Sequence, residues 1–280
     1  MASLLERVLA AHRFDSGRFV PLEAGAGIGW IRRDLLARLR RWPEVFTIGE
    51  ERVRLSDSLA DERSRTAALA EVARGLARDG VLSGWRDETF AISGGPGAPL
   101  FHIERSAVRF FGLTSSASHL NGFVQGRDGI HIWIARRSAA KSIDPALLDT
   151  LVGGGIPSGQ DAWEALLREC GEEAGIERSL AIQARPCGML KVCHEVPNGL
   201  HSEVLHTHDL ELSAGFRPRN VDGEVSDFML LSAAETADRI ANGQFTVEAG
   251  LVALDFLMRH EAIGADARLR AVLDRCRVRP

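Results

Sequence analysis

Three stretches in the first third of the chain repeat apolar residues every three or four positions, the spacing of an amphipathic helix. They are Leu4, Leu5, Val8 and Leu9; Leu35, Leu36 and Leu39; and Leu69, Val72, Ala73 and Leu76. The segment "ARDGVLSGW", 77–85, supplies a glycine that ends the last of them. This third is therefore expected to be mainly helical, and the glycine- and proline-rich segment 93–99 is expected to be a loop.

After this loop, apolar and polar residues alternate, which indicates β-strands. In "GFVQGRDGIHIWIARR", 122–137, two apolar stretches flank a Gly-Arg-Asp-Gly turn and predict a hairpin. Further strands are expected at 184–196, 203–212 and 225–231, and helices at 233–242 and 247–260. The change in pattern divides the chain into a smaller N-terminal accessory domain, residues 1–100, and a second domain, residues 101–280.

The composition narrows the possible partners. A net charge of −4 argues against a general nucleic-acid binder, because such proteins carry an excess of basic residues. The four cysteines form no CxxC pair, so neither a zinc knuckle nor a disulfide framework is indicated, and a reducing compartment fits. The first residues, "MASLLERVLAAHRF", are typical of an amphipathic helix and not of an export signal. No apolar run approaches the roughly 20 residues that span a bilayer. We expect a cytoplasmic protein without nucleic-acid or membrane partners, and the oligomeric state stays open.

A well-marked helix is predicted for residues 161–174. Asp161 can cap its start, and Gly175 can take the left-handed conformation that ends it. One stripe of this helix is apolar and comprises Trp163, Leu166, Leu167, Cys170 and Ala174. Because these residues recur at helical spacing, the stripe is expected to face the core.

A second face of the same helix is acidic. Glu169, Glu172 and Glu173 stand at i, i+3 and i+4, where like charges repel one another by about 0.2–0.5 kcal/mol per pair. A divalent cation would offset this repulsion, because Mg²⁺ takes hard oxygen ligands and keeps waters for contact with substrate phosphates. The alternative is an ordinary solvated acidic face, partly neutralised by Arg168.

The whole segment "GGGIPSGQDAWEALLRECGEEAGI", 153–176, resembles the signature of the Nudix hydrolases. That signature reads Gly, five residues, Glu, seven residues, Arg-Glu, an apolar residue, any residue, Glu-Glu, any residue, Gly, and an apolar residue. The positions that agree in register are Gly154, Arg168, Glu169, Cys170, Glu172, Glu173, Gly175 and Ile176. Only the first glutamate fails, because Gln160 occupies its position.

The resemblance implies an α+β fold, the Nudix α/β/α sandwich with a mixed sheet, joined here to the smaller, mainly helical N-terminal domain. It implies that Glu169, Glu172 and Glu173 hold Mg²⁺ or Mn²⁺ together with a backbone carbonyl near Gly153. The implied reaction is hydrolysis of a diphosphate linked to another group, with Glu173 and Arg168 in the catalytic machinery. The metal neutralises phosphate charge and lowers the pKa of the water that attacks phosphorus.

Gln160 and Glu224 need separate interpretation. In the family, the first glutamate supports the motif's arginine and the metal ligands, so Gln160 is expected to accept a hydrogen bond from Arg168 while its missing charge weakens metal binding. A catalytic base often comes from a later loop. Glu224 in "PRNVDGEVSDFMLL", 218–231, is our candidate, either as a metal ligand or as the group that takes the water's proton. The alternative for Glu224 is an exposed carboxylate in a turn.

Longer stretches, among them "IWIARRSAAKSIDPALLDTLVGGGIPSG" and "HDLELSAGFRPRNVDGEVSDFMLL", resemble a Nudix subgroup with an extra N-terminal domain. That subgroup includes plant enzymes and the domain joined to thiamine pyrophosphokinase in fungi. It implies removal of one phosphate from thiamine diphosphate or its damaged oxo- and oxy- forms. Arg136, Arg137 and Lys141 are expected to contact the diphosphate, unless they form a solvated basic cluster. Trp30 is expected to supply an aromatic wall for the organic group.

Two other functions stay open at this stage. The same chemistry could act on ADP-ribose or a dinucleotide, and the products would then be two monophosphates instead of orthophosphate and one monophosphate. A protein of another class would be a catalytically idle module that only binds a phosphorylated ligand. Gln160 favours that idle module, and the glutamate trio of the signature opposes it. The partner is a small molecule with a diphosphate in the first two cases and a phosphorylated ligand in the third.

Overall fold

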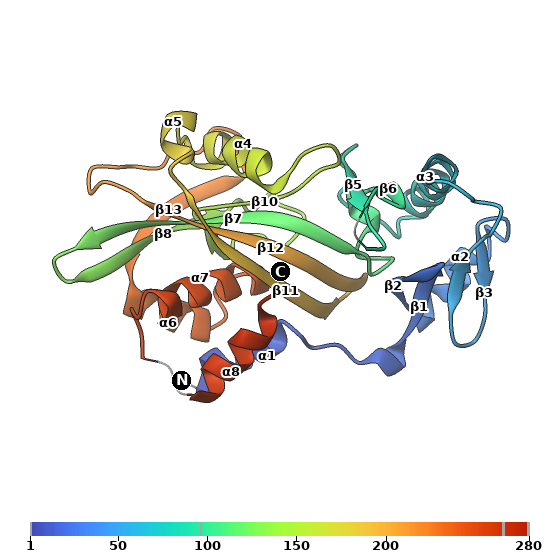
Figure 1. Ribbon diagram of the computed structural model, residues 1–280, viewed down its shortest axis with the longest axis horizontal. Helices are drawn as coiled ribbons and strands as arrows, with labels where there is room; N and C mark the ends of the chain where they lie inside the picture. Colours follow the sequence, from blue (N-terminus) through green and yellow to red (C-terminus); the bar gives the residue numbers. More distant parts are fainter. Residues whose placement is uncertain (1, 96, 265–266, 279–280) are drawn as a thin grey trace.

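The computed structural model describes residues 2–95, 97–264 and 267–278. They form two packed regions that lie side by side along the longest axis (Figure 1). The larger region holds a seven-stranded sheet between layers of helices, and the smaller one holds two small sheets and the helix α3. No helix within the described ranges is long and apolar enough to cross a membrane.

The large sheet has the strand order β11-β12-β7-β8-β13, with β10 paired to β7 and β9 paired to β8. Its strands are β7 (Thr114–Gly126), β8 (Gly129–Arg137), β9 (Leu148–Thr150), β10 (Val152–Gly155), β11 (Arg185–Val196), β12 (Gly199–Glu211) and β13 (Val225–Ser232). β12 runs parallel to β7, whereas the other paired strands are antiparallel, so the sheet is mixed. The hairpin predicted at 122–137 is confirmed, since Gly126 pairs with Gly129 at the turn between β7 and β8.

Helices cover both faces of this sheet (Figure 1). They are α4 (Ala162–Ala174) and α5 (Arg178–Ala181) on one face, and α6 (Ala233–Ala241) and α7 (Val247–Arg259) on the other, where α1 (Ala2–Ala10) and α8 (Ala267–Cys276) also pack. The expected α/β/α sandwich with a mixed sheet is therefore confirmed.

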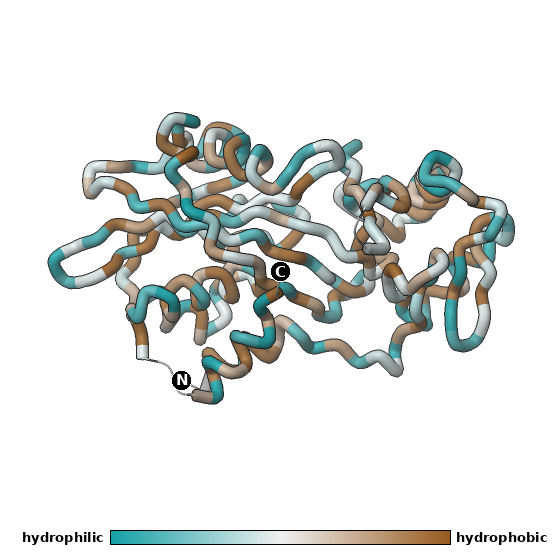
Figure 2. The backbone as a smooth tube through the Cα atoms, in the orientation of Figure 1, coloured by the Kyte–Doolittle hydropathy of each residue, from teal (hydrophilic) through white to brown (hydrophobic). Residues whose placement is uncertain are grey.

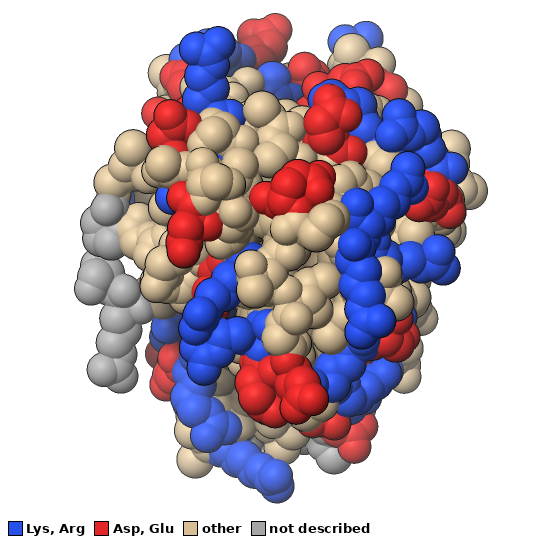
Figure 3. All heavy atoms as spheres, turned by 90° about the vertical axis from the view of Figure 1, so that its right-hand side faces the viewer, with Lys and Arg blue, Asp and Glu red and all other residues tan. Residues whose placement is uncertain are grey.

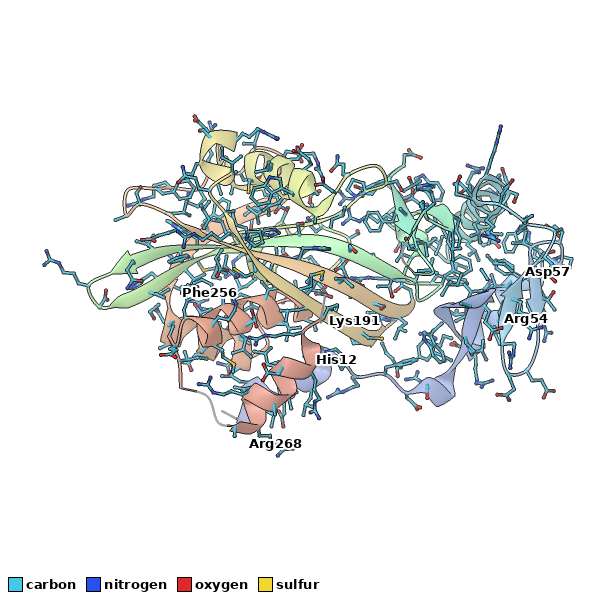
Figure 4. All side chains as sticks on the ribbon, viewed as in Figure 1. His12, Arg54, Asp57, Lys191, Phe256 and Arg268 are labelled. Carbon is cyan, nitrogen blue, oxygen red and sulfur yellow. The ribbon has the colours of Figure 1, made fainter. Side chains whose placement is uncertain are left out.

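Two hydrophobic cores fill the sandwich, one on each side of the sheet. Phe256 of α7 lies beneath the sheet (Figure 4), with its ring centroid 5.3 Å from that of Phe123. On the other side, Leu166 and Cys170 of α4 pack with Leu151. Figure 2 shows that brown, apolar segments run through the strands and helices that meet in these cores. Burial of these apolar faces holds the helices on the sheet.

The N-terminal region contains more β-structure than the sequence pattern indicates. Its elements are β1 (Phe19–Ala24), β2 (Ala26–Arg32), α2 (Leu36–Leu39), β3 (Phe46–Ile48), β4 (Val53–Leu55), α3 (Glu62–Arg78), β5 (Thr89–Ile92) and β6 (Phe101–Glu104). The expectation of a mainly helical region is right for α3 and misses the sheet β2-β1-β4-β3. Pro21 and the glycines of "AGAGIG" interrupt the alternation in β1 and β2, and β3 and β4 are only three residues long, too short to show a period.

The border between the two regions lies later in the chain than the predicted residue 100. One core extends from Val20 to Leu113 and includes Phe101 and Phe110, so these residues belong to the N-terminal region. The helix α1 packs instead against α6, α7 and α8, and its Leu4 belongs to the core of the sandwich. We therefore propose that the border falls at residues 113–114, where β7 begins, and that α1 is part of the second region.

Backbone contacts attach the two regions to each other. Leu200 N–H, at the start of β12, donates a hydrogen bond to the carbonyl of Arg109 at 2.9 Å. The outer end of the N-terminal region mixes charges of both signs (Figure 3). There, Arg52 and Arg54 both pair with Glu23, at 3.3 and 3.2 Å, so that opposite charges partly compensate one another.

Candidate active site

The acidic helix α4 begins and ends where the sequence predicts. Asp161 accepts hydrogen bonds from the backbone N–H groups of Trp163 and Glu164, at 3.0 and 2.8 Å, and so caps the first turn. Gly175 ends the helix with a φ of 63°, a left-handed conformation that glycine adopts without strain. The apolar stripe faces the core, where Leu166 is fully buried. These contacts fix the position of the helix's acidic face.

The glycine run 153–155 forms the strand β10, against which α4 packs. Gly153 N–H donates a hydrogen bond to Glu173 Oε2 at 2.9 Å. A side chain at Gly154 would place its Cβ 2.3 Å from Glu169 Oε1, so a larger residue would displace that carboxylate. The glycines therefore let two carboxylates of α4 approach the backbone of β10 closely.

Both of these carboxylates are short of positive charge. Burial, reinforced by the charge of Glu169, raises the pKa of Glu173 well above its usual value. Burial also raises the pKa of Glu169, although the guanidinium of Arg168 opposes the shift. Carboxylate oxygens are the ligands that Mg²⁺ and similar hard cations prefer. The buried Glu173 and the partly buried Glu169, both costly to ionise, fit a divalent cation.

Arg168 connects the remaining residues of the signature. Its guanidinium donates hydrogen bonds to Glu169 at 2.8 Å and to Glu172 at 2.6 Å. Its Nε also donates to Gln160 Oε1 at 3.5 Å, the contact expected for that glutamine. At this distance the hydrogen bond is weak. Arg168 therefore partly neutralises two of the three glutamates, whereas Glu173 relies on a backbone donor.

Glu224 is not a free carboxylate of an exposed turn. It forms ion pairs with Lys141 and with Arg86, the latter at 2.8 Å. Burial raises the pKa of Glu224, but hydrogen bonds from Lys141 and Arg86 outweigh it and lower the pKa to about 2. A carboxylate with such a pKa is a poor proton acceptor near neutral pH, because a general base works best when its pKa is close to the working pH.

Arg136 and Arg137 point to opposite sides of β8, because successive side chains of a strand alternate. Arg137 lines a cleft beside β10 and pairs with Asp149 at 2.8 Å. Arg136 donates instead to the carbonyl of Ala146 at 3.0 Å and does not line the cleft. Of the two arginines expected to contact the diphosphate, only Arg137 lines the cleft, so Arg136 is no longer a candidate for that contact.

Trp30 also lies away from this cleft. Its ring packs edge-on against Phe14, with 5.1 Å between the centroids, and Trp30 is not among the residues that line the cleft. The N-terminal region contributes other side chains there, including Arg86, Phe90 and Arg105. Trp30 therefore does not form the aromatic wall of this cleft that the sequence led us to expect, although its region does border the cleft.

The cleft itself runs along one face of β7. Ser115, Ala117 and His119 line it, and residues two apart on a strand share a face. At one end lie Gly153–Gly155, with Arg137 and Lys141; we call this the glycine end. Of the residues that the sequence singled out, Arg137, Lys141, Gly153 and Gly154 line this end. Glu224 and Glu173 do not line it but contact its wall, through Lys141 and Gly153.

At the other end of the cleft lie His201 and Glu203 of β12 and Glu248 of α7; we call this the histidine end. His201 Nε2 is 2.7 Å from Glu248 Oε1 and 3.5 Å from Glu203 Oε2. His194 Nε2 lies 3.3 Å from the same Glu248 oxygen. In the described part of the chain, His194, His201 and Glu248 are the one trio whose possible metal ligands lie within 4.8 Å of each other.

The pKa values at the histidine end move opposite to those at the glycine end. Burial raises the pKa of Glu248, but the charge of His201 and the hydrogen bond with His194 outweigh it, so the pKa falls well below its usual value. The pKa of Glu203 is also lowered, because contacts with His201 and Ser115 outweigh burial. Burial lowers the pKa of His201, yet the charge of Glu248 raises it to about 9.

The sequence pattern singles out none of the residues at the histidine end. His201 lies two residues before the strand expected at 203–212, Glu203 is the first residue of that strand, and Glu248 lies in the first turn of an ordinary amphipathic helix. The two segments meet only because β12 and α7 pack together, and no spacing within either of them signals that contact. Asp149, which pairs with Arg137, lies only four residues before the signature segment 153–176.

Comparison with known proteins gives the same assignment for the second region. The family model described as "NUDIX domain" matches residues 120–249, and "Domain of unknown function (DUF4743)" matches residues 3–115. Nudix hydrolase 24, chloroplastic, of Arabidopsis thaliana is 38% identical over 253 residues, which are 88% of this chain and 69% of the relative. Nudix hydrolase 20, chloroplastic, of the same plant is 35% identical over 257 residues, 87% of this chain and 68% of the relative.

A third relative, an uncharacterized protein of Saccharomyces cerevisiae, is 29% identical over 234 residues, 78% of this chain and 68% of the relative. The likeness to all three relatives extends well beyond the signature segment 153–176. It therefore covers both regions of the molecule and agrees with the geometry of β10 and α4. The chain belongs to the Nudix hydrolase family and is a pyrophosphohydrolase.

Proposed function

We propose that this enzyme removes one phosphate from thiamine diphosphate, or from its damaged oxo- and oxy- analogues, in a reaction that depends on Mg²⁺ or Mn²⁺. The observation that carries the proposal is the glycine end of the cleft. There, cationic side chains suited to phosphate oxygens stand beside buried carboxylates suited to a divalent cation. The resemblance of the chain to the thiamine-related subgroup supports the choice of substrate.

The residues of α4 and β10 supply the proposed cation site. Glu169, Glu172 and Glu173 would hold the ion together with the carbonyl of Gly153. When bound, such an ion neutralises phosphate charge and lowers the pKa of a coordinated water. Arg168 positions Glu169 and Glu172 through its two short hydrogen bonds.

The cations of the cleft are assigned to the diphosphate. Arg137 presents a planar guanidinium, which matches phosphate oxygens, and Asp149 holds it in place at 2.8 Å. Lys141 provides a compact charge, and Glu224 holds it at the cleft wall. With a pKa of about 2, Glu224 is assigned to positioning Lys141 and Arg86 and not to accepting the water's proton.

The proposed compartment remains the cytoplasm. All four cysteines are free, which suits a reducing environment. The names of the two plant relatives place those proteins in chloroplasts.

A panel of diphosphate compounds tests the substrate. Thiamine diphosphate, oxythiamine diphosphate, ADP-ribose and a dinucleotide are incubated with the full chain and Mg²⁺, Mn²⁺ or EDTA, and the phosphate products are separated. We expect orthophosphate plus thiamine or oxythiamine monophosphate, and no turnover with EDTA. Consumption of ADP-ribose without any thiamine monophosphate or oxythiamine monophosphate would overturn the proposed substrate while leaving the pyrophosphohydrolase intact.

A further inference from the structure

The histidine end contains a buried imidazole nitrogen without a hydrogen-bond partner among the described residues. His201 is 5% exposed, and its Nε2 lies near carboxylate oxygens of Glu248 and Glu203, but neither contact has the geometry of a hydrogen bond. A buried polar atom left in this state costs free energy, so it is expected to meet a partner when the site is in use. Because His201 lines the cleft, a ligand in the cleft can provide that partner.

The arrangement of protons on His201 does not suit a metal ion. Arg109 Nε–H donates to His201 Nδ1 at 3.2 Å, which requires a lone pair on Nδ1 and leaves the proton of the neutral ring on Nε2. In the cationic ring, which the charge of Glu248 favours, both nitrogens carry protons, so Nδ1 no longer accepts from Arg109 but Nε2 still presents its proton. A metal bound to Nε2 would have to displace the proton that Nε2 carries in both states. His201 therefore presents a donor, and not a metal-binding lone pair, to the cleft.

The neighbouring carboxylates present acceptors. Ser115 Oγ donates to Glu203 Oε1 at 2.8 Å and so fixes the direction of this carboxylate. Glu248 is 8% exposed and stays ionised because His201 and Arg109 compensate its charge.

The two ends are separated by a distance that suits one small molecule. Glu203 pairs with Ser115, and Gly153 pairs with His119. Ser115 and His119 are four residues apart on β7, which corresponds to about 13 Å at 3.3 Å per residue. A substrate whose diphosphate lies at Gly153 can thus extend its organic group to His201 along the face formed by β7.

We propose that His201, Glu203 and Glu248 form the subsite that recognises an amino-substituted nitrogen heterocycle in the organic half of the substrate. The amino N–H of such a ring donates to a carboxylate, and the adjacent ring nitrogen accepts from His201 Nε2–H. This proposal deepens the proposed function and depends on it only for the position of the diphosphate at the glycine end. Glu203 becomes a specificity-determining residue, and Ser115 a residue that positions it.

Matched pairs of ligands test the subsite. Thiamine and adenosine carry the amino group, whereas oxythiamine and inosine carry an oxo group in its place. Their diphosphates are compared as substrates, and the free compounds are compared as ligands by calorimetry, with the full-length wild type, Glu203→Gln, Ser115→Ala and the control Glu211→Gln. Glu211 is exposed at the end of the same strand, so its substitution removes an equal charge outside the cleft.

Glu203→Gln replaces an acceptor-only carboxylate by an amide that also donates. We expect KM for the amino compound to rise about tenfold or more, because a hydrogen bond to a charged group is lost. KM for the oxo compound should fall or stay constant, and kcat should change little. Ser115→Ala keeps the charge of Glu203 and should raise KM for the amino compound about threefold. Thus, the proposal remains testable if Glu203→Gln fails to fold.

The outcomes separate this proposal from the proposed function. If thiamine diphosphate is hydrolysed while both variants keep the wild-type ratio of amino to oxo substrate, the subsite is rejected and the function stands. If thiamine neither binds nor reacts, but the preference for adenosine over inosine depends on Glu203, the substrate is rejected and the subsite stands. Stoichiometric Zn²⁺ that survives dialysis and is lost in His194→Gln would overturn the subsite, because it would identify the cluster as a metal centre.

Discussion

Each end of the cleft has one buried and one partly buried glutamate, yet the pKa values of these glutamates shift in opposite directions at the two ends. At the glycine end, the pKa values of Glu169 and Glu173 are raised. At the histidine end, those of Glu203 and Glu248 are lowered. Burial opposes ionisation in all four cases, so the difference comes from the neighbours, chiefly from His201 between the two far carboxylates.

This contrast shows that buried carboxylates of one type can serve two purposes. A group of carboxylates with too few cationic side chains around it is stabilised most by an added cation, as expected of a metal site. A set already compensated by an imidazole gains little from a cation and offers stable hydrogen-bond acceptors instead. The glycine end is therefore suited to metal and phosphate, and the histidine end to an N–H group of the substrate.

The largest effect is expected for Glu173→Gln. The amide keeps an acceptor for Gly153 N–H but removes the charge that faces the proposed cation. Loss of several kcal/mol of charge stabilisation lowers turnover by at least about 100-fold, since about 1.4 kcal/mol corresponds to a factor of ten. Orthophosphate release at several Mg²⁺ concentrations measures the effect.

Glu164→Gln is the matched control for this change. Glu164 lies on the same helix but is exposed and pairs with Arg178 at 2.9 Å. An exposed ion pair contributes about 0–1 kcal/mol to stability, and its loss should leave turnover unchanged. Equal activity of the Glu173→Gln variant and wild type would remove the distinction between the two ends of the cleft.

The sequence alone predicts the glycine end because its chemistry lies in one continuous segment. Gly153, Gln160, Arg168, Glu173 and Gly175 all belong to one strand, loop and helix, so their spacing fixes which side chains meet. The alternation of Ile130, Ile132 and Ile134 likewise predicts the hairpin of the large sheet. Local periodicity is therefore sufficient to predict both the helix α4 and its acidic face.

The histidine end could not be predicted in the same way. Arg109, His201 and Glu248 come from three distant segments, and only the packing of the N-terminal region on β12, together with that of α7, brings them together. The sequence assigns Trp30 to the substrate because it shows no packing partner for this residue. In the fold its ring packs against Phe14. Contacts between elements far apart in the chain produce no repeating pattern in the sequence.

A smaller effect is expected for Glu224→Gln. If Glu224 accepted the water's proton, its loss would cost about 10²–10⁴-fold and abolish the acidic limb of the pH profile. With its pKa near 2, held there by Lys141 and Arg86, we expect a decrease of less than about tenfold, mostly in KM. The acidic limb should keep its position, and its disappearance from the pH profile of kcat would assign Glu224 as the base.

The glycine end should also make the metal-free protein sensitive to pH. The folded pKa of Glu173 is raised, so above about 4.3 the unfolded state loses this proton first and stability falls as pH rises, until the folded pKa is passed. In EDTA, the melting temperature of wild type should therefore drop more between pH 5 and 8 than that of Glu173→Gln, by at least about 2 °C.

Magnesium should reduce the difference between wild type and Glu173→Gln in this drop of melting temperature, because it stabilises the ionised form of Glu173. The same measurement of melting temperature against pH on Glu203→Gln is the comparison at the histidine end. The pKa of Glu203 is lowered, so its ionised form stabilises the folded protein at these pH values. If the melting temperatures of wild type and Glu173→Gln change in parallel across this pH range, the buried carboxylate of Glu173 does not destabilise the protein. A bound cation would then have no destabilisation to offset.

The smallest effect is expected for Gln160→Glu, which restores the usual residue of the signature. A carboxylate at this position would attract Arg168, whose Nε is now 3.5 Å from the glutamine oxygen, and would draw it away from Glu169 and Glu172. Groups that orient metal ligands change metal affinity by about 10–100-fold when they are mutated, and an exposed one such as Gln160 should act more weakly. We expect the Mg²⁺ concentration for half-maximal activity to fall about threefold, while the preference for amino over oxo substrates at the histidine end stays constant. A change in that preference without a change in Mg²⁺ requirement would mean that the two ends are coupled and do not act as separate sites.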